Sequence, residues 1–330
     1  MKRRRFSGAD EIEVSEIGLG CWQIGGADWG DVSDEAALDT LRAAADAGVT
    51  LFDTSDVYGL GRSETLIGRF LRERPADPLF VATKVGRFPE PGWPGNFGRD
   101  AVRAHTEASL RRLGVDALDV TQLHCIPTDE LRRGDVFDFL RELQAEGKIR
   151  RFGASVESME EADLCLAQPG LSSLQIIFNV LRQKPVDTLF AAAKERGVAL
   201  IVRLPLASGV LSGRMTAQTR FDERDHRNYN RDGQAFNVGE TFAGIPFEVA
   251  VDLADALSHY VPEGLTMAQM ALRWCLDFDA VTSVIPGAKR PEQARANAAA
   301  SDLPPLSPGL HEDLRGFYSA RVAAHIRGPY

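Results

Sequence analysis

Short apolar segments alternate with longer helical segments along almost the entire chain, and this alternation limits the possible folds. The apolar, β-prone segments cover residues 16–20, 50–54, 79–84, 118–124, 149–155, 173–178, 198–204 and 280–286. The segments between them show helical spacing and end signals; the first begins at Ser33, a good N-cap, and stops at Gly48. Strict alternation predicts a parallel sheet with right-handed crossovers. Eight such units in 330 residues predict a single (β/α)8 TIM barrel domain spanning residues 1–330.

A doubly wound sheet is the alternative fold for such a pattern. It normally needs fewer units, or a glycine-rich phosphate loop that opens the first helix. The segment GLGCWQIGG at 18–26 contains glycines but does not form a GxGxxG motif that opens a helix, which favours the barrel. The irregular stretch 212–262 follows the seventh strand. A loop of that length in a compact domain is usually a lid or a binding loop, and Arg227 and Asn228 lie within it.

Composition and charge exclude several classes of protein. The net charge of −9 argues against nucleic-acid binding. The four cysteines are widely separated, which predicts neither a metal site nor disulfides and suits a reducing cytoplasm. No segment is apolar over the ~18 residues that a membrane span requires. The basic N-terminus has no apolar run behind it, so a secretory signal is not expected.

Ionisable side chains end three consecutive predicted strands. Asp53 ends the second strand, Lys84 the third and His124 the fourth, and Tyr58 follows in the loop after the second. Each residue alone has an ordinary explanation as a turn former, a rim charge or a packing side chain. Because the carboxyl ends of barrel strands surround the active site, the four together predict a reactive cluster.

The chemistry that suits this cluster is proton transfer to a carbonyl oxygen. A lysine ammonium about 4 Å from a phenol contributes ~4 kcal/mol, or roughly 3 pKa units, in favour of the phenolate. We therefore expect Lys84 to lower the pKa of Tyr58, with Asp53 as the counter-ion of Lys84. His124 would orient the substrate carbonyl by a hydrogen bond. None of these side chains supplies a hydride, so a nicotinamide cofactor is required.

At this point the sequence resembles the aldo-keto reductase family. The motifs that carry the resemblance are FDTSDVYG (52–59), TK (83–84), QLH (122–124), EGKIRRFGAS (146–155), PLASGVLSGR (205–214) and IPGAKRPEQARAN (285–297). They occur in order and cover nearly the whole chain. The resemblance implies that Asp53, Tyr58, Lys84 and His124 form the family's catalytic tetrad, with Tyr58 as the proton donor.

The resemblance also implies an NADP(H) site across the barrel mouth. Ser155 and Gln175 would hold the carboxamide, Arg214 the pyrophosphate, and Lys289 and Arg290 a 2′-phosphate, which favours NADP over NAD. The full set of implied cofactor residues is Gly20, Cys21, Trp22, Asp53, Ser155, Gln175, Arg203, Pro205, Leu206, Ser208, Gly209, Leu211, Gly213, Arg214, Ile285, Gly287, Lys289, Arg290, Gln293 and Asn297. Two positions depart from the family pattern: Val156 replaces an Asn, and Arg203 replaces an aromatic residue that stacks on the nicotinamide.

The predicted substrate is a small carbonyl compound, bound by Trp22, Tyr58, Trp93 and His124, with Trp29 as a further wall. Two other functions stay open. The first is an NADP-binding regulatory barrel with little turnover, like the relatives that serve as potassium-channel subunits. The second is a lyase that uses Lys84 as a Schiff-base nucleophile. The sequence predicts neither the identity of the substrate nor the oligomeric state.

Overall fold

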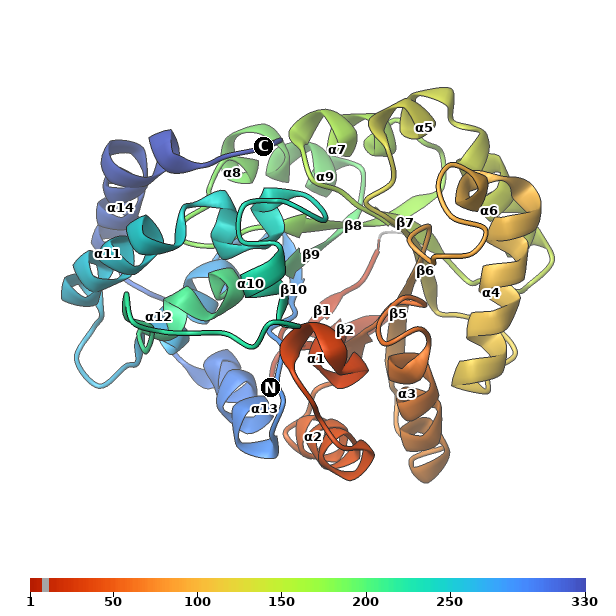
Figure 1. The fold of residues 1–330 in the computed structure, drawn as a ribbon, viewed down its shortest axis with the longest axis horizontal. Helices are drawn as coiled ribbons and strands as arrows, with labels where there is room; N and C mark the ends of the chain where they lie inside the picture. The colour runs from red at the N-terminus through yellow and green to blue at the C-terminus, as the bar shows by residue number, and fades with distance from the viewer. Residues whose placement is uncertain (8–11) are drawn as a thin grey trace.

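Eight parallel strands form the centre of the molecule, as the alternation predicts. A computed structural model describes residues 1–7 and 12–330 (Figure 1). Each strand lies beside the next one in the chain, from β3 to β10. Backbone hydrogen bonds from Gly18 N to Val284 O (2.8 Å) and from Gly20 N to Pro286 O (3.1 Å) join the first strand to the last. The strands are β3 (Leu19–Gly20), β4 (Leu51–Asp53), β5 (Phe80–Val85), β6 (Val120–His124), β7 (Phe152–Ser155), β8 (Leu171–Ile177), β9 (Ala199–Arg203) and β10 (Val281–Val284).

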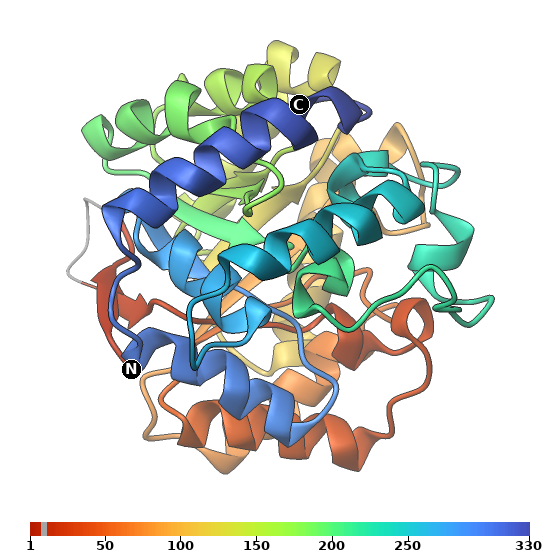
Figure 2. The same ribbon diagram turned by 90° about the vertical axis from the view of Figure 1, so that its left-hand side faces the viewer.

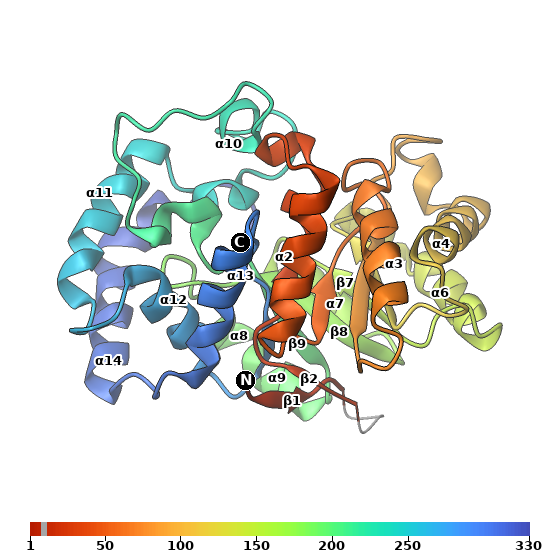
Figure 3. The same cartoon turned by 90° about the horizontal axis from the view of Figure 1, so that it is seen from below.

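Helices cover the outside of this sheet. Ser33 caps the first long helix as predicted, since its side chain accepts a hydrogen bond from Ala36 N at 3.3 Å. The first and last helices of the barrel, α2 and α13, lie side by side (Figure 3). The helices are α1 (Trp22–Gly25), α2 (Asp34–Asp46), α3 (Arg62–Glu73), α4 (Arg99–Leu113), α5 (Thr128–Arg133), α6 (Asp135–Ala145), α7 (Met159–Leu166), α8 (Pro185–Thr188), α9 (Phe190–Glu195), α10 (His226–Tyr229), α11 (Phe247–Leu257), α12 (Met267–Leu276), α13 (Pro291–Ala298) and α14 (Pro308–Phe317).

A small hairpin closes the end of the barrel opposite the cavity described below. Its strands β1 (Arg3–Arg5) and β2 (Glu13–Ser15) pair antiparallel. Phe6, which follows β1, is 1% exposed and packs with Leu51, Phe80 and Ile201 from the barrel strands. This hairpin was not predicted, because its strands are too short and too charged to give a clear pattern in the sequence. Residues 8–11, part of the N-terminal segment considered for a secretory signal, lie outside the described residues.

The long connection after β9 is partly helical, which corrects the expectation of an irregular stretch at 212–262. Helix α11 occupies residues 247–257 of that range. It begins after Pro246, and it buries Phe247, Val251 and Leu257 against the core, which is the spacing of one helix face. Helix α14 lies beside α11 on the outer surface (Figures 1 and 2). The irregular part of this connection, named the lid segment for the role expected of it, is therefore shorter and ends at about Ile245.

None of the helices within residues 1–7 and 12–330 combines the length and the apolar character needed to cross a lipid bilayer.

Candidate active site

A cavity of about 600 Å³ opens at the carboxyl ends of the strands. This volume lies within the usual range for ligand sites. Tyr58 and His124 line one part of it, and side chains of α13 line another. The lining residues are Gly20, Trp22, Gln23, Trp29, Asp53, Tyr58, His124, Ser155, Gln175, Arg203, Leu204, Pro205, Leu206, Ser208, Gly209, Ser212, Arg214, Met215, Arg227, Glu240, Thr266, Ala268, Gln269, Leu272, Ile285, Pro286, Gly287, Ala288, Lys289, Gln293, Ala296 and Asn297.

Lys84 lies at the centre of a hydrogen-bonded cluster beneath this cavity. Its side chain is almost completely buried, and its Nζ donates to Asp53 Oδ1 at 2.7 Å, to Thr54 O at 2.7 Å and to Tyr58 Oη at 3.2 Å. Gln175 Nε2 donates to the other carboxylate oxygen of Asp53 at 2.6 Å. An ammonium has three N–H groups, and all of those of Lys84 have acceptors. Lys84 is therefore held as a charged donor, which disfavours its use as a Schiff-base nucleophile.

The expected fall in the pKa of Tyr58 is wrong. Burial raises the pKa of Tyr58 to about 12 and outweighs the opposing effect of Lys84, while Asp53 raises it further. The attraction of the ammonium is smaller than the cost of placing a phenolate in a buried site. Burial lowers the pKa of Lys84, but Asp53 and Tyr58 raise it more, and the net direction is upward. The phenol thus keeps its hydrogen at neutral pH.

His124 is a neutral imidazole at the edge of this cluster. Burial lowers the pKa of His124 well below its usual value, and the positive charges of Arg87, Lys84 and Arg203 lower it further. Its ring meets that of Tyr58 edge to face, with the centroids 5.8 Å apart. Its Nδ1 lies 3.0 Å from Ser55 Oγ. Because the ring is uncharged, His124 suits a hydrogen-bonding role better than that of a strong acid.

A close backbone contact positions Tyr58. The turn that carries it passes against α1, and a Cβ on Gly59 would lie 2.2 Å from Gly25 O. Gly59 also has a φ of +59°, which glycine adopts without strain. The result is that the Trp22 ring stacks on the Tyr58 ring, with centroids 5.9 Å apart and planes 19° apart.

The lid segment after β9 packs on Trp22 through aromatic side chains. His226 contacts both Trp22 and Trp29, with centroid distances of 4.6 Å and 4.4 Å, and the two indoles also meet edge to face at 5.6 Å. Asp28 joins the lid segment to α1: one of its carboxylate oxygens accepts from Trp22 Nε1 at 3.0 Å and the other from Tyr229 Oη at 2.7 Å. Helix α10 therefore lies against the segment that contains α1 (Figure 3).

The buried His226 makes stability sensitive to acid. Burial lowers the pKa of His226 from 6.5 to about 4. Between these values the unfolded chain binds a proton that the folded chain does not, so stability is complete above pH 6.5 and falls as the pH decreases. We expect a loss of up to about 3 kcal/mol in the free energy of unfolding by pH 4. Urea unfolding at stepwise pH measures this loss. The variant His226→Phe keeps a ring in contact with both tryptophans and should show a shallower pH dependence of the free energy of unfolding. An equal pH dependence in the variant would show that other groups cause the loss.

Several residues that the resemblance implies do not line the cavity. Cys21 and Leu211 are completely buried in the hydrophobic core. Gly213 and Arg290 are exposed outside the lining. Trp93 is 56% exposed, and its indole N–H donates to Gly86 O at 2.9 Å. These placements oppose direct side-chain roles for Cys21, Leu211 and Trp93 in ligand binding. The other implied residues line the cavity, apart from Lys84, which lies beneath it.

Arg203 replaces the family's aromatic residue, and an ion-pair network holds it in place. Its guanidinium lies 3.4 Å from Glu240 Oε2 and donates to Val156 O at 3.3 Å. Glu240 also pairs with Arg87 at 3.2 Å, and Arg87 pairs with Glu157 at 3.0 Å. The carboxylates of Glu157 and Glu240 are thus matched by two guanidinium groups. Glu240 was not predicted as a site residue, because it lies in the lid segment, where no strand end or spacing marks it.

The segment after β9 turns sharply around the cavity. Three non-glycine residues in it, Leu204, Ala207 and Ser208, have φ values of +54°, +47° and +55°. Such conformations cost free energy and are concentrated at functional sites. The Ser208 hydroxyl secures the turn, since Oγ donates to Glu240 O at 3.2 Å and accepts from Phe242 N at 3.1 Å.

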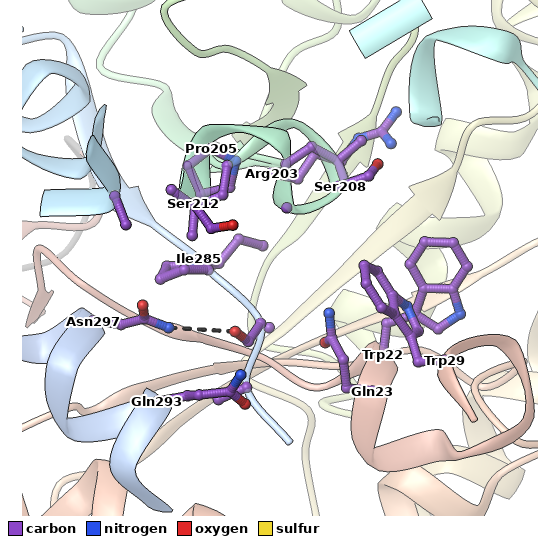
Figure 4. A pocket seen from close by; sticks show the side chains of 18 of the residues that line it. Trp22, Gln23, Trp29, Arg203, Pro205, Ser208, Ser212, Ile285, Gln293 and Asn297 are labelled. Atoms are coloured by element: carbon purple, nitrogen blue, oxygen red, sulfur yellow. Dashed lines mark hydrogen bonds between the residues drawn. The ribbon is translucent and has the colours of Figure 1, made fainter. Parts of the chain in front are cut away.

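The far part of the cavity is formed by α13 and the turn that precedes it. Figure 4 shows Gln293 and Asn297 on α13, across the cavity from Trp22 and Trp29. Asn297 Nδ2 donates to Gly287 O at 3.3 Å. Gln23, which no local sequence signal marks, lies against Gly287: a Cβ there would lie 2.1 Å from Gln23 Nε2, so a side chain at this position would displace the Gln23 amide. Lys289 Nζ donates to Trp29 O.

Comparison with known proteins places the chain among enzymes of one family. The model of the Aldo/keto reductase family matches residues 16–318. Aldo-keto reductase YhdN of Bacillus subtilis (strain 168) is 32% identical over 295 residues, which cover 86% of this chain and 84% of that protein. The NADH-specific methylglyoxal reductase of Escherichia coli (strain K12) is 28% identical over 315 residues, 90% of this chain and 92% of that protein.

Solved structures give the same result. The holo form of aldo-keto reductase AKR11C1 from Bacillus halodurans superposes with a TM-score of 0.77 at 26% identity and covers 96% of both chains. An aldo/keto reductase from Klebsiella pneumoniae in complex with NADP and acetate superposes with a TM-score of 0.68 at 26% identity, over 96% of this chain and 95% of that one. The family match over residues 16–318, together with these relatives, shows that this protein belongs to the aldo/keto reductase family.

Proposed function

We propose that residues 1–330 form one catalytic domain that reduces a small aldehyde or ketone to an alcohol with NADP(H), and that Tyr58 donates the proton. The observation that carries this proposal is the hydrogen bond from Lys84 Nζ to Tyr58 Oη at 3.2 Å. Since Lys84 occupies a lone pair of the phenol oxygen, the phenol hydrogen is free to point into the cavity. The ammonium also stabilises the phenolate that remains after the proton has left.

The residues around the cavity suit a nicotinamide dinucleotide. The cavity extends from Tyr58 to α13, and Lys289 and Arg227 add positive charge to its lining. Gln23 Oε1 and Arg203 Nε are buried with no hydrogen-bond partner among the described residues, so both can bind a polar ligand. When bound, the nicotinamide supplies the hydride. The chain itself would orient the carbonyl through His124, exclude water with Trp22 and the lid, and provide the proton from Tyr58 Oη.

The preference for NADP over NAD is part of this proposal. Burial and the nearby charge of Arg227 lower the pKa of Lys289. A phosphate beside Lys289 would relieve that repulsion and form charge-assisted hydrogen bonds. Arg290 lies next to it at the start of α13, where the helix dipole also favours an anion. The relatives do not decide the matter, because one is named NADH-specific and one structural neighbour contains NADP.

The variant Lys289→Met tests this preference. We expect the KM for NADPH to rise about 10-fold or more, since a hydrogen bond to a charged group is worth roughly 1.5–3 kcal/mol, while the KM for NADH changes little. Arg295→Met is the matched control, because Arg295 is an exposed cation on the same helix that does not line the cavity. An equal rise in the KM for NADPH and in that for NADH would show that Lys289 does not bind the 2′-phosphate.

The direct test of the function is oxidation of NADPH and NADH against a panel of aldehydes and ketones that includes methylglyoxal. Consumption of cofactor that depends on the carbonyl compound supports the proposal. Tight cofactor binding with no turnover on any member of the panel would instead favour the regulatory barrel.

A further inference from the structure

A second buried carboxyl group lies behind His124, connected to it through Ser55. The Oγ of Ser55 is 3.0 Å from His124 Nδ1 and 3.1 Å from Asp56 Oδ1. Ser55 and Asp56 are both completely buried, and neither lines the cavity. Asp56 Oδ2 has no hydrogen-bond partner among the described residues. The three groups thus form a short chain from the interior to the ring that faces the substrate.

The hydrogens in this chain are coupled, because Ser55 has only one hydroxyl hydrogen to donate. If Asp56 is ionised, Ser55 donates to its carboxylate, and Ser55 Oγ then accepts from His124 Nδ1–H. If Asp56 is protonated, it donates to Ser55, and Ser55 donates to His124 Nδ1. A neutral imidazole carries one N–H, so the second arrangement places that hydrogen on Nε2. Hydrogen bonds to a carboxylate are roughly twice as strong as neutral ones, which makes the first arrangement dominant once Asp56 ionises.

We propose that Asp56 is a positioning residue that decides, through Ser55, which ring nitrogen of His124 carries the hydrogen. The effect on catalysis rests on the proposed carbonyl reductase function, whereas the hydrogen-bonded chain from Asp56 to His124 does not. When Asp56 loses its proton, that hydrogen moves to Ser55, the hydrogen of Ser55 moves to His124 Nδ1, and the hydrogen of Nε2 leaves. One proton is released in total, and no covalent bond to carbon changes.

The two arrangements differ in what Nε2 offers to the substrate. With hydrogen on Nε2, His124 donates to the carbonyl oxygen and to the negative charge that develops on it, which supports the reaction in both directions because both pass through one transition state. With a lone pair on Nε2, His124 can only accept from the hydroxyl of a bound alcohol, and that stabilisation is lost. The chain therefore carries its own pH-dependent control of the hydrogen bond to the reacting oxygen.

The surroundings of Asp56 place this change near neutral pH. Burial raises the pKa of Asp56 to about 7, and the negative charge of Glu64 on α3 also raises it. Ser55, Arg112 on α4 and the backbone N–H of Val57 oppose that rise. On the side of the barrel, Asp56 N donates to the backbone carbonyl of Lys84 on β5 at 3.3 Å, and the neutral His124 lies on the neighbouring strand β6.

Nuclear magnetic resonance of the protein labelled with [15N]histidine tests the proposal without any substrate. Long-range ¹H–¹⁵N spectra distinguish the two tautomers of each of the six histidines, and the variant His124→Asn identifies the signals of His124. Between pH 5.5 and 8.5 we expect His124 to change from the Nε2–H to the Nδ1–H form. A single tautomer across this range would overturn the proposal, even if the enzyme reduces carbonyl compounds well.

Three variants separate the coupling from a structural role. In Asp56→Asn the amide does not titrate, so His124 should hold one tautomer at every pH. Ser55→Ala breaks the chain and should also abolish the change. Glu64→Gln removes the negative charge near Asp56 and should move the midpoint of the tautomer change to lower pH. Because Gln has nearly the same shape as Glu, this variant still tests the proposal if Asp56→Asn or Ser55→Ala fails to fold. A change that persists unshifted in these variants would contradict the proposal.

Kinetics provide a second readout. In the wild type, kcat/KM for carbonyl reduction at saturating NADPH should fall about 10-fold or more between pH 6 and pH 8.5 as the hydrogen leaves Nε2, because a hydrogen bond to the developing oxyanion is lost. In Asp56→Asn that fall should be absent. If the wild type turns over no substrate, the proposed function fails while the spectra still decide the tautomer.

Discussion

Replacing Tyr58 with Phe is expected to lower kcat for carbonyl reduction by about 10²–10⁴-fold, the usual contribution of a general acid. The phenol is the group that combines a free hydrogen with contact to the cavity, and Lys84 supports its conjugate base from 3.2 Å. Because the ring remains, the stack on Trp22 and the binding of cofactor should be preserved. The measurement is the initial rate of NADPH oxidation at saturating carbonyl substrate, beside the Kd of the cofactor.

Tyr260→Phe is the control for this experiment, since Tyr260 packs on Phe317, and neither residue lines the cavity. It should retain full activity. If Tyr58→Phe also retained wild-type kcat, the proton would have to come from another group, and the mechanism proposed here would be wrong.

Removing the charge of Lys84 is expected to reduce stability strongly as well as activity. Lys84 and Asp53 are 0% and 3% exposed, and their atoms meet at 2.7 Å. In Lys84→Met the Asp53 carboxylate remains buried without its partner, which typically costs about 3–5 kcal/mol. The double variant Lys84→Met/Asp53→Asn removes both charges and should recover much of that loss. Urea unfolding at pH 7 gives these differences.

The matched control is Lys194→Met, which removes a lysine from a surface pair with Asp279, whose side chains are 53% and 81% exposed. Its cost should stay below about 1 kcal/mol. A double variant no more stable than Lys84→Met would show that lost packing, rather than the unpaired carboxylate, causes the destabilisation. The double variant should still have little reductase activity, because the phenolate of Tyr58 would lack its cation.

Much of the fold could be predicted from the sequence because its signals are local. Apolar β-prone runs, N-caps such as Ser33 and stop signals such as Gly48 depend on residues close together in the chain, and all eight predicted strands occur in the structure. Helix α11 and the β1–β2 hairpin were missed for opposite reasons. Helix α11 is hidden in a long polar connection, while the hairpin is stabilised by the packing of Phe6 in the barrel end rather than by any pattern of its own.

The site could be predicted in its residue types, but its electrostatics could not. The order of strands alone brings Asp53, Lys84 and His124 to one rim. The direction of the pKa change at Tyr58 depends on how much water the fold removes, and burial is a property of the whole structure.

Spacing along the chain was sufficient to predict the barrel, the strand-end cluster and the motifs of an aldo/keto reductase, because local patterns encode them. Which groups meet across distant segments became clear only in the folded molecule. Glu240 pairs with Arg203 and Arg87, and His226 contacts Trp22 and Trp29, across segments that are far apart in the chain. Such contacts depend on burial and on distances in space, which no local pattern specifies.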